Sequence, residues 1–113
     1  MPINVFYLDD EEDLCEIFSD IFSSDDIKVT TFTDPKKIIE TVKVNAPDMI
    51  FLDYRLPSMN GDEVAQKLTG GIPKYLITGE ISVNTKYKFN KIFSKPYKND
   101  EIMKVILDLK VTE

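Results

Sequence analysis

The sequence predicts an α/β fold in which five parallel strands form a doubly wound sheet in the order 2-1-3-4-5, with helices on both faces. Short apolar runs alternate with helix-length segments, which is typical of this class. Met49–Leu52 is apolar throughout, as expected for a parallel strand buried on both faces. Polar residues end or follow four of the runs, at Asp9, Asp53, Thr78 and Lys95. Because the carboxyl ends of parallel strands share one edge, these groups are expected to meet in a crevice there.

The first third of the chain predicts a strand, a helix and a second strand. Residues 3–8 form the first apolar run, and residues 10–13 are all acidic, which favours a helix beginning there. Lys28–Phe32, rich in Val and Thr, is expected to be the second strand. The helix between them has an apolar stripe with helical spacing, made by Leu14, Ile17, Phe18, Ile21 and Phe22.

The middle of the chain predicts a second helix and the central strand. Asp34 followed by Pro35 is typical of a helix N-terminus, with the aspartate as N-cap and the proline at the first helical position. Pro47–Asp53 is the most apolar strand and is expected at the centre of the sheet. The helix between them would turn Ile38, Ile39 and Val42 inward.

After the central strand, a turn-forming loop over residues 56–61 is expected to lead into a third helix. This helix is predicted over Asp62–Leu68 and closed by Gly70 and Gly71. Pro73–Ile77 is the fourth predicted strand.

The segment Glu80–Asn90 has poor helix propensity and no clean apolar stripe, so only a short or irregular fourth helix is expected there. Ile92–Ser94 is the fifth predicted strand. A last helix is expected to begin near Asn99. Its inward positions are Ile102, Val105, Ile106 and Leu109.

Composition excludes several classes of function. The 113 residues suit a single domain spanning residues 1–113. With no histidine and one cysteine, the chain cannot build a Ser-His-Asp triad, a Cys-His nucleophile or a typical zinc site. A net charge of -6 argues against direct binding of nucleic acid. No apolar run is long enough to span a membrane and no export leader is visible, so a cytoplasmic protein is expected.

The three carboxylates of Asp9, Asp10 and Asp53 point to a divalent cation, since close carboxylates repel one another unless a cation offsets their charge. Mg²⁺ suits such a group because it prefers oxygen ligands and keeps several waters. Thr78 and Lys95 would then serve as donors to an anionic group, such as a phosphoryl group attached at Asp53. Asp53 would thus be a nucleophile toward a phosphoryl group.

At these residues the chain resembles the receiver domain of two-component response regulators, over essentially its whole length. The resemblance implies a flavodoxin-like receiver fold, here with a shortened fourth helix because the fourth and fifth strand ends, at Thr78 and Lys95, are closely spaced in sequence. The resemblance rests on four segments taken together: 8–11 (LDDE), 51–61 (FLDYRLPSMNG), 77–80 (ITGE) and 94–97 (SKPY).

The resemblance also implies the site. Asp53 would accept a phosphoryl group from a histidine kinase or phosphotransfer protein. Mg²⁺ would be held by Asp10, Asp53 and the backbone carbonyl of Arg55, with Asp9 acting through water.

Four further residues have roles implied by the resemblance. Lys95 and Thr78 would bind the phosphoryl oxygens, and Gly79 would leave room beside them. The Lys95–Pro96 peptide bond is expected to be cis.

The chain departs from the family pattern at a position that modulates signalling. Receiver domains often have an aromatic residue three positions before the lysine, and here that residue is Ile92. Phe93 lies one position later, so its side chain would face the other side of the sheet. An aromatic rotamer switch is therefore not expected.

Arg55 and Glu80 each lie two positions beyond a site residue, and we expect both to project over the mouth of the crevice. In the family these positions modulate hydrolysis of the aspartyl phosphate. The two charges would either pair across the opening or remain separately solvated.

Three functions are compatible with these residues. The first is a phosphorylatable receiver, monomeric or weakly dimeric, that is not a metabolic enzyme and acts by binding an unknown downstream protein. The second is an interaction module on the same fold that works without phosphorylation. The third, a small aspartate-nucleophile phosphatase, typically has a second Asp two positions after the nucleophile, where this chain has Arg55.

Overall fold

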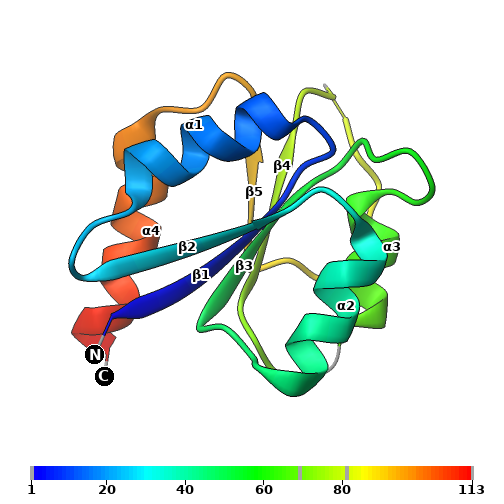
Figure 1. Cartoon of the computed structure of the whole chain (residues 1–113). Coiled ribbons are helices and arrows are strands. Elements are labelled where there is room, and N and C mark those ends of the chain that lie inside the picture. Colours follow the sequence, from blue (N-terminus) through cyan, green and yellow to red (C-terminus); the bar gives the residue numbers. More distant parts are fainter. Residues whose placement is uncertain (1, 69, 81, 113) are drawn as a thin grey trace.

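The computed structural model describes residues 2–68, 70–80 and 82–112, the last three of these by their backbone only. Five parallel strands form one sheet in the order β2-β1-β3-β4-β5. Helices α1 and α4 cover one face and α2 and α3 the other (Figure 1). The predicted α/β class and strand order are therefore confirmed.

The helices and strands begin and end within two residues of the sequence predictions. The strands are β1 Ile3–Leu8, β2 Ile27–Phe32, β3 Met49–Asp53, β4 Lys74–Thr78 and β5 Lys91–Ser94. The helices are α1 Glu12–Phe22, α2 Pro35–Val44, α3 Gly61–Lys67 and α4 Asn99–Thr112. Within the described part of the chain, no helix has both the length and the apolar character needed to cross a bilayer.

Local hydrogen bonds explain where α2 and α3 begin. The Asp34 side chain accepts a hydrogen bond from Lys36 N at 3.0 Å, as expected of an N-cap. Asn60 and Glu63 form a reciprocal capping box at the start of α3, with distances of 2.8 and 3.1 Å. At the other end α3 stops at Lys67, so Gly70, with φ of 86°, lies in the following loop and does not cap the helix as expected.

Two apolar clusters fill the space between the sheet and its helices. On the α1 and α4 face, Phe18 is fully buried and stacks on Tyr7, with ring centroids 4.0 Å apart. On the α2 and α3 face the core is mainly aliphatic. The central strand β3 is buried along its whole length, which explains its unbroken apolar sequence.

The expectation of a short fourth helix is wrong for the described residues of this region. Residues 82–90, which we call the connector, contain no helix and form an irregular segment between β4 and β5, with bends at residues 86, 87 and 90. Exposure alternates strictly along them, because every second side chain turns inward. The inward side chains are Val83, Thr85, Tyr87 and Phe89. β-branched and aromatic residues at every second position favour an extended chain over a helix.

Buried polar groups anchor the connector to the rest of the domain. Asp62, in the first turn of α3, is 7% exposed and accepts hydrogen bonds from Lys86 N at 3.0 Å and Tyr87 N at 2.8 Å. Lys74 of β4 is fully buried, and its Nζ donates to Tyr87 Oη at 3.2 Å and to Ile72 O at 3.0 Å. The connector is therefore an integral part of the fold.

Candidate functional site

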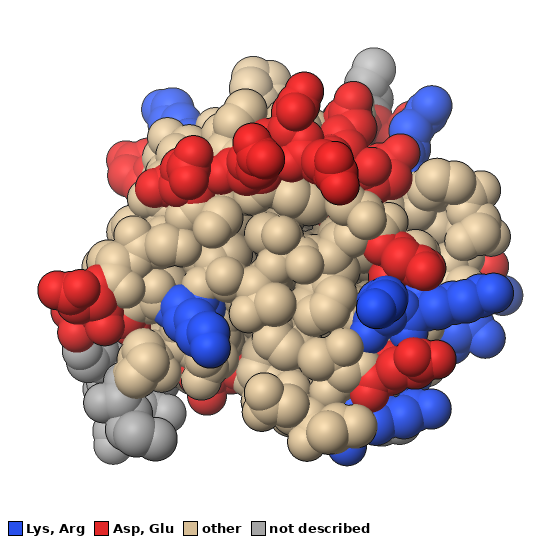
Figure 2. Space-filling view, viewed as in Figure 1, with Lys and Arg blue, Asp and Glu red and all other residues tan. Residues whose placement is uncertain are grey.

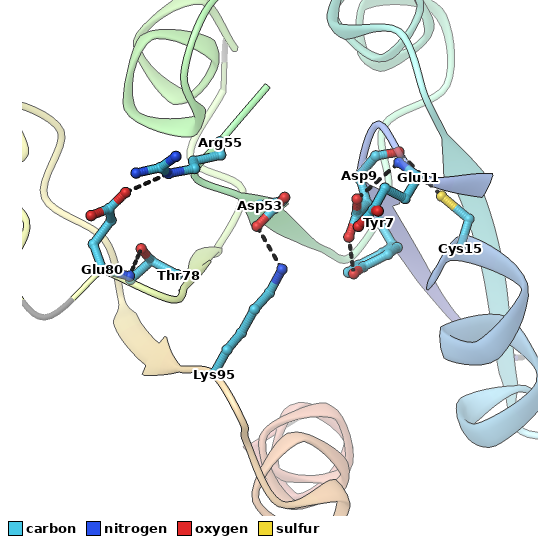
Figure 3. A network of polar contacts seen from close by, with 9 residues as sticks. All are labelled: Tyr7, Asp9, Glu11, Cys15, Asp53, Arg55, Thr78, Glu80 and Lys95. Atoms are coloured by element: carbon cyan, nitrogen blue, oxygen red, sulfur yellow. Dashed lines mark hydrogen bonds and ion pairs between the residues drawn. The ribbon is translucent and has the colours of Figure 1, made fainter. Parts of the chain in front are cut away.

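A polar crevice of about 410 Å³ opens at the carboxyl ends of the strands. Asp53 ends β3 and Thr78 ends β4, while Lys95 directly follows β5. Figure 3 shows these side chains converging from three neighbouring strands. The lining residues are Asp10, Glu11, Asp53, Arg55, Thr78, Gly79, Glu80 and Lys95.

Three carboxylates lie together at the crevice. Asp9, Asp10 and Asp53 each offer one oxygen, and these oxygens lie within 4.8 Å of one another. Asp9 and Asp53 are buried and Asp10 is exposed, so the group can be reached from solvent on one side. Hard oxygen donors in such a group fit Mg²⁺.

Asp9 is held by the protein itself. Its Oδ2 accepts a hydrogen bond from Tyr7 Oη at 2.8 Å, and its Oδ1 accepts one from Glu11 N at 3.0 Å. Burial raises the pKa of Tyr7 far above its usual value, so the phenol remains a donor. The Asp9 carboxylate is therefore fixed in orientation beside those of Asp10 and Asp53.

Asp53 and Lys95 form an ion pair at the centre of the crevice. Lys95 Nζ lies 3.0 Å from Asp53 Oδ1. Burial raises the pKa of Asp53, and the hydrogen bond from Lys95 opposes this shift only in part because Asp9 adds like charge. Burial alone would lower the pKa of Lys95, but the hydrogen bond and charge of Asp53 outweigh it and the pKa is raised.

The rim of the crevice is formed by residues after β3 and β4. Thr78 is 3% exposed, and its Oγ1 accepts a hydrogen bond from Glu80 N at 3.0 Å. Arg55 Nε donates to Glu80 Oε1, so the two side chains meet across the opening, as Figure 3 shows. A Cβ on Gly79 would meet nothing within 4 Å, which leaves space beside Thr78.

The model of the response regulator receiver domain family matches residues 5–107. The chain is a response regulator receiver domain. Its fold is similar to a CheY-like receiver domain protein from Methanospirillum hungatei JF-1, with a TM-score of 0.86 and 18% identity, covering 99% of this chain and 96% of that one. The receiver domain of the Francisella response regulator 1452 gives a TM-score of 0.83 at 20% identity, covering 98% and 99%.

Two curated relatives have similar sequences. The probable transcriptional regulatory protein TcrX of Mycobacterium tuberculosis is 32% identical over 88 residues, which cover 75% of this chain and 38% of that protein. A putative two-component response regulator of Arabidopsis thaliana, ARR21, is 29% identical over 85 residues, which cover 71% and 14%. The receiver domain thus spans less than half the length of either relative.

The structure of this receiver domain brings together most of the residues singled out in the sequence. Seven of them line the crevice, and Asp9 lies beside two of these, Asp10 and Asp53. Ile92 lies outside the crevice: it is 43% exposed on β5, whereas Phe93 is 3% exposed and packs in the α1 and α4 core. The Lys95–Pro96 peptide bond is cis.

Sequence reasoning missed three residues that shape the site. Tyr7 holds Asp9, and its place two positions earlier, on the same face of β1, was the available signal. Glu11 lines the crevice and its backbone binds Asp9. A Cβ on Gly61 would collide with the backbone oxygen of Asp53, so this glycine is needed for close approach and not only for a turn.

Proposed function

We propose that this receiver domain accepts a phosphoryl group on Asp53 and signals by binding a partner in the modified state. The proposal rests on the position of the Asp53 carboxylate. It lies at the floor of an open crevice, with Lys95 Nζ at 3.0 Å and two further carboxylates beside it. A nucleophile, a fixed cation and a cation-binding acidic group at one point suit phosphoryl transfer.

In the proposed reaction, an Asp53 oxygen attacks phosphorus as the bond from phosphorus to the donor breaks. The electron pair of that bond leaves with the donor, which takes up a proton. Lys95 and Thr78 then donate hydrogen bonds to the phosphoryl oxygens. Asp10, Asp53 and the backbone carbonyl of Arg55 would hold Mg²⁺, with Asp9 supporting it through water. The ion would supply positive charge for the transferred group.

The donor in this proposal is a histidine kinase or a phosphotransfer protein, because receiver domains interact with such kinases and with downstream targets. We place the exchange in the cytoplasm, and we propose that the domain acts as a monomer or weak dimer. The target is a protein whose identity this site does not specify.

Two alternatives receive less support from the site. A module that works without phosphorylation would have no use for the joint placement of Asp53, Lys95 and the acidic group. An aspartate-nucleophile phosphatase would need a general acid near the position of Arg55, which here pairs with Glu80.

Mg²⁺-dependent modification tests the proposed function. Incubation with acetyl phosphate and Mg²⁺ should add the mass of one phosphoryl group, measured by intact-mass spectrometry. Removing Mg²⁺ with a chelator should suppress the gain. Asp10→Asn should suppress it at the same Mg²⁺ concentration, because one fewer carboxylate remains to hold the ion against its hydration preference.

The matched control is Asp48→Asn, which makes the same chemical change before β3, at the opposite edge of the sheet from the crevice. It should be modified as fast as the unaltered domain. Modification that is equally fast without Mg²⁺, or in Asp10→Asn, would contradict the proposed metal site.

The Arg55–Glu80 pair is expected to prolong the life of the modified state. It spans the mouth of the crevice and would restrict the approach of an attacking water. The Arg55 side chain is 82% exposed, so the pair is weak, and its loss should speed dephosphorylation by no more than about fivefold. Decay of the phosphorylated mass after removal of the donor measures this in Arg55→Ala, Glu80→Ala and the double variant.

Lys43→Ala removes an exposed cation at the far end of α2 and should leave the decay rate unchanged. The double variant should decay no faster than the more affected single variant, because both residues act through one contact. Decay that is unchanged or slower in all three variants would show that the pair does not shield the site.

A further inference from the structure

The outer edge of β5 is open. β5 is the last strand of the sheet and pairs only with β4 among the described residues (Figure 1). Lys95 N donates to Thr78 O at 2.8 Å, and backbone groups alternate in direction along a parallel strand. The backbone groups of Ile92 and Ser94 therefore point away from β4. An edge of this kind can pair with a further strand.

An apolar side chain lies beside this edge. Ile92 is 43% exposed, while its neighbour Phe93 is 3% exposed on the opposite face of the sheet. No helix covers Ile92 from the described residues 82–90, since the connector there contains none. The edge thus offers both backbone hydrogen-bonding groups and a hydrophobic contact.

The connector and β5 form a positively charged stretch of the sequence. Every charged residue from 81 to 98 is a lysine, although the whole chain has a net charge of -6. Lys95 is engaged by Asp53, but Lys86, Lys88 and Lys91 are exposed. By contrast, every charged residue from 9 to 26 is acidic, and Figure 2 shows acidic side chains gathered in a band along α1.

The connector is held in a conformation that turns its lysines outward. Asp62 binds the backbone amides of Lys86 and Tyr87, and Tyr87 turns inward to Lys74. Lys86 and Lys88 are consequently exposed, at alternate positions of the segment that leads into β5. A partner would find this surface already ordered, which reduces the entropic cost of binding.

We propose that the β5 edge binds an extended, acidic segment of a partner protein, which adds to the sheet as a further strand. Backbone groups at Ile92 and Ser94 would provide the strand pairing, and Ile92 would contact an apolar side chain of the segment. Acidic side chains at alternate positions would face Lys88 and Lys91. In strand addition of this kind, backbone hydrogen bonds provide the affinity and side-chain contacts provide the specificity.

The same charges disfavour two other occupants. Two copies of β5 paired edge to edge would bring their own lysines close together, and like charges across strands are destabilising. A nucleic acid would use the lysines but would leave the open backbone groups without a strand, and it would be repelled by the net charge of -6.

Binding of a defined peptide tests the proposal in the unphosphorylated protein, so its outcome is independent of Asp53 chemistry. The probe is a short, capped, fluorescent peptide in which glutamate alternates with valine, followed by anisotropy. Saturable binding should be accompanied by amide NMR shifts at Lys91–Ser94. Lys88→Glu with Lys91→Glu should weaken it on the order of tenfold, the equivalent of about 1.4 kcal/mol.

Ile92→Pro removes an outward backbone N–H without touching the pairing to β4, and it should abolish binding. Ile92→Val keeps that N–H and should bind the peptide almost normally. Both variants should still gain one phosphoryl mass if they are folded. If Ile92→Pro does not fold, the variant with Lys88→Glu and Lys91→Glu still tests the proposal.

Three results would overturn the proposal. The first is the absence of binding, or shifts confined to the crevice or α1. The second is equal binding of a matched peptide with lysine in place of glutamate. The third is a different occupant: tighter binding of a single-stranded oligonucleotide at the same amides, or a dimer in light scattering that Ile92→Pro converts to monomer.

Discussion

Replacing Asp53 with asparagine is expected to abolish phosphoryl acceptance completely. Asp53→Asn keeps the size of the side chain but replaces the attacking oxygens with an amide, a far weaker nucleophile. The neighbouring carboxylates are poorly placed to take over, because Asp9 is buried with both oxygens hydrogen-bonded and the ion pair that Lys95 forms among the described residues is with Asp53. Intact-mass spectrometry after acetyl phosphate and Mg²⁺ treatment should show no gain.

Glu11→Gln is the matched control, since it removes one negative charge from the same crevice without removing the acceptor. It should retain the full mass gain. Asp53→Asn should still unfold cooperatively, because the loss of its bond to Lys95 is partly offset by relief of repulsion with Asp9. A phosphoryl mass on folded Asp53→Asn would show that another residue is the acceptor.

Asp62→Asn is expected to release the connector from the domain. Each carboxylate oxygen of Asp62 accepts one backbone N–H, from Tyr87 and from Lys86. An asparagine has the same shape but only one acceptor oxygen, so its amide group would place a donor against one of these N–H groups. Losing hydrogen bonds to a charged acceptor at a buried site should lower the free energy of unfolding by about 2–3 kcal/mol.

Hydrogen exchange locates this effect, because the amides of Lys86 and Tyr87 should exchange much faster in Asp62→Asn. Gln66→Ala is the control: it removes a further contact to Asp62 at 3.2 Å but leaves both backbone amides paired. Its stability should change by less than about 0.5 kcal/mol. Unchanged protection of the two amides in Asp62→Asn would mean that Asp62 does not hold the connector.

The sheet and the composition of the crevice could be predicted because both depend on short-range patterns. Apolar runs ending in Asp53, Thr78 and Lys95 specify which residues lie at the carboxyl ends of the strands, and alternation of strands and helices specifies that those ends meet. The same holds for helix starts such as Asp34 with Pro35, where neighbours in sequence make the contact. The predicted and observed bounds of the five strands therefore differ by two residues or fewer.

The connector could not be predicted in the same way. Residues that turn inward alternate from Val83 to Phe89, a pattern that disfavours a helix, but nothing in the local sequence indicates what these residues pack against. That depends on Asp62 and Lys74, which contact Tyr87 from α3 and β4. A carboxylate and a lysine read from sequence are expected at the surface, and only the surrounding fold shows that both are buried and paired.

The sequence by itself determined the fold class and which polar strand-end residues meet in the crevice, because these follow from periodicity and from the geometry of parallel sheets. Only the tertiary structure decided that Arg55 pairs with Glu80, that Asp62 anchors Lys86 and Tyr87, and that a connector without a helix lies beside an open β5 edge. Those features depend on contacts between residues distant in sequence, and such contacts exist only after the chain has packed.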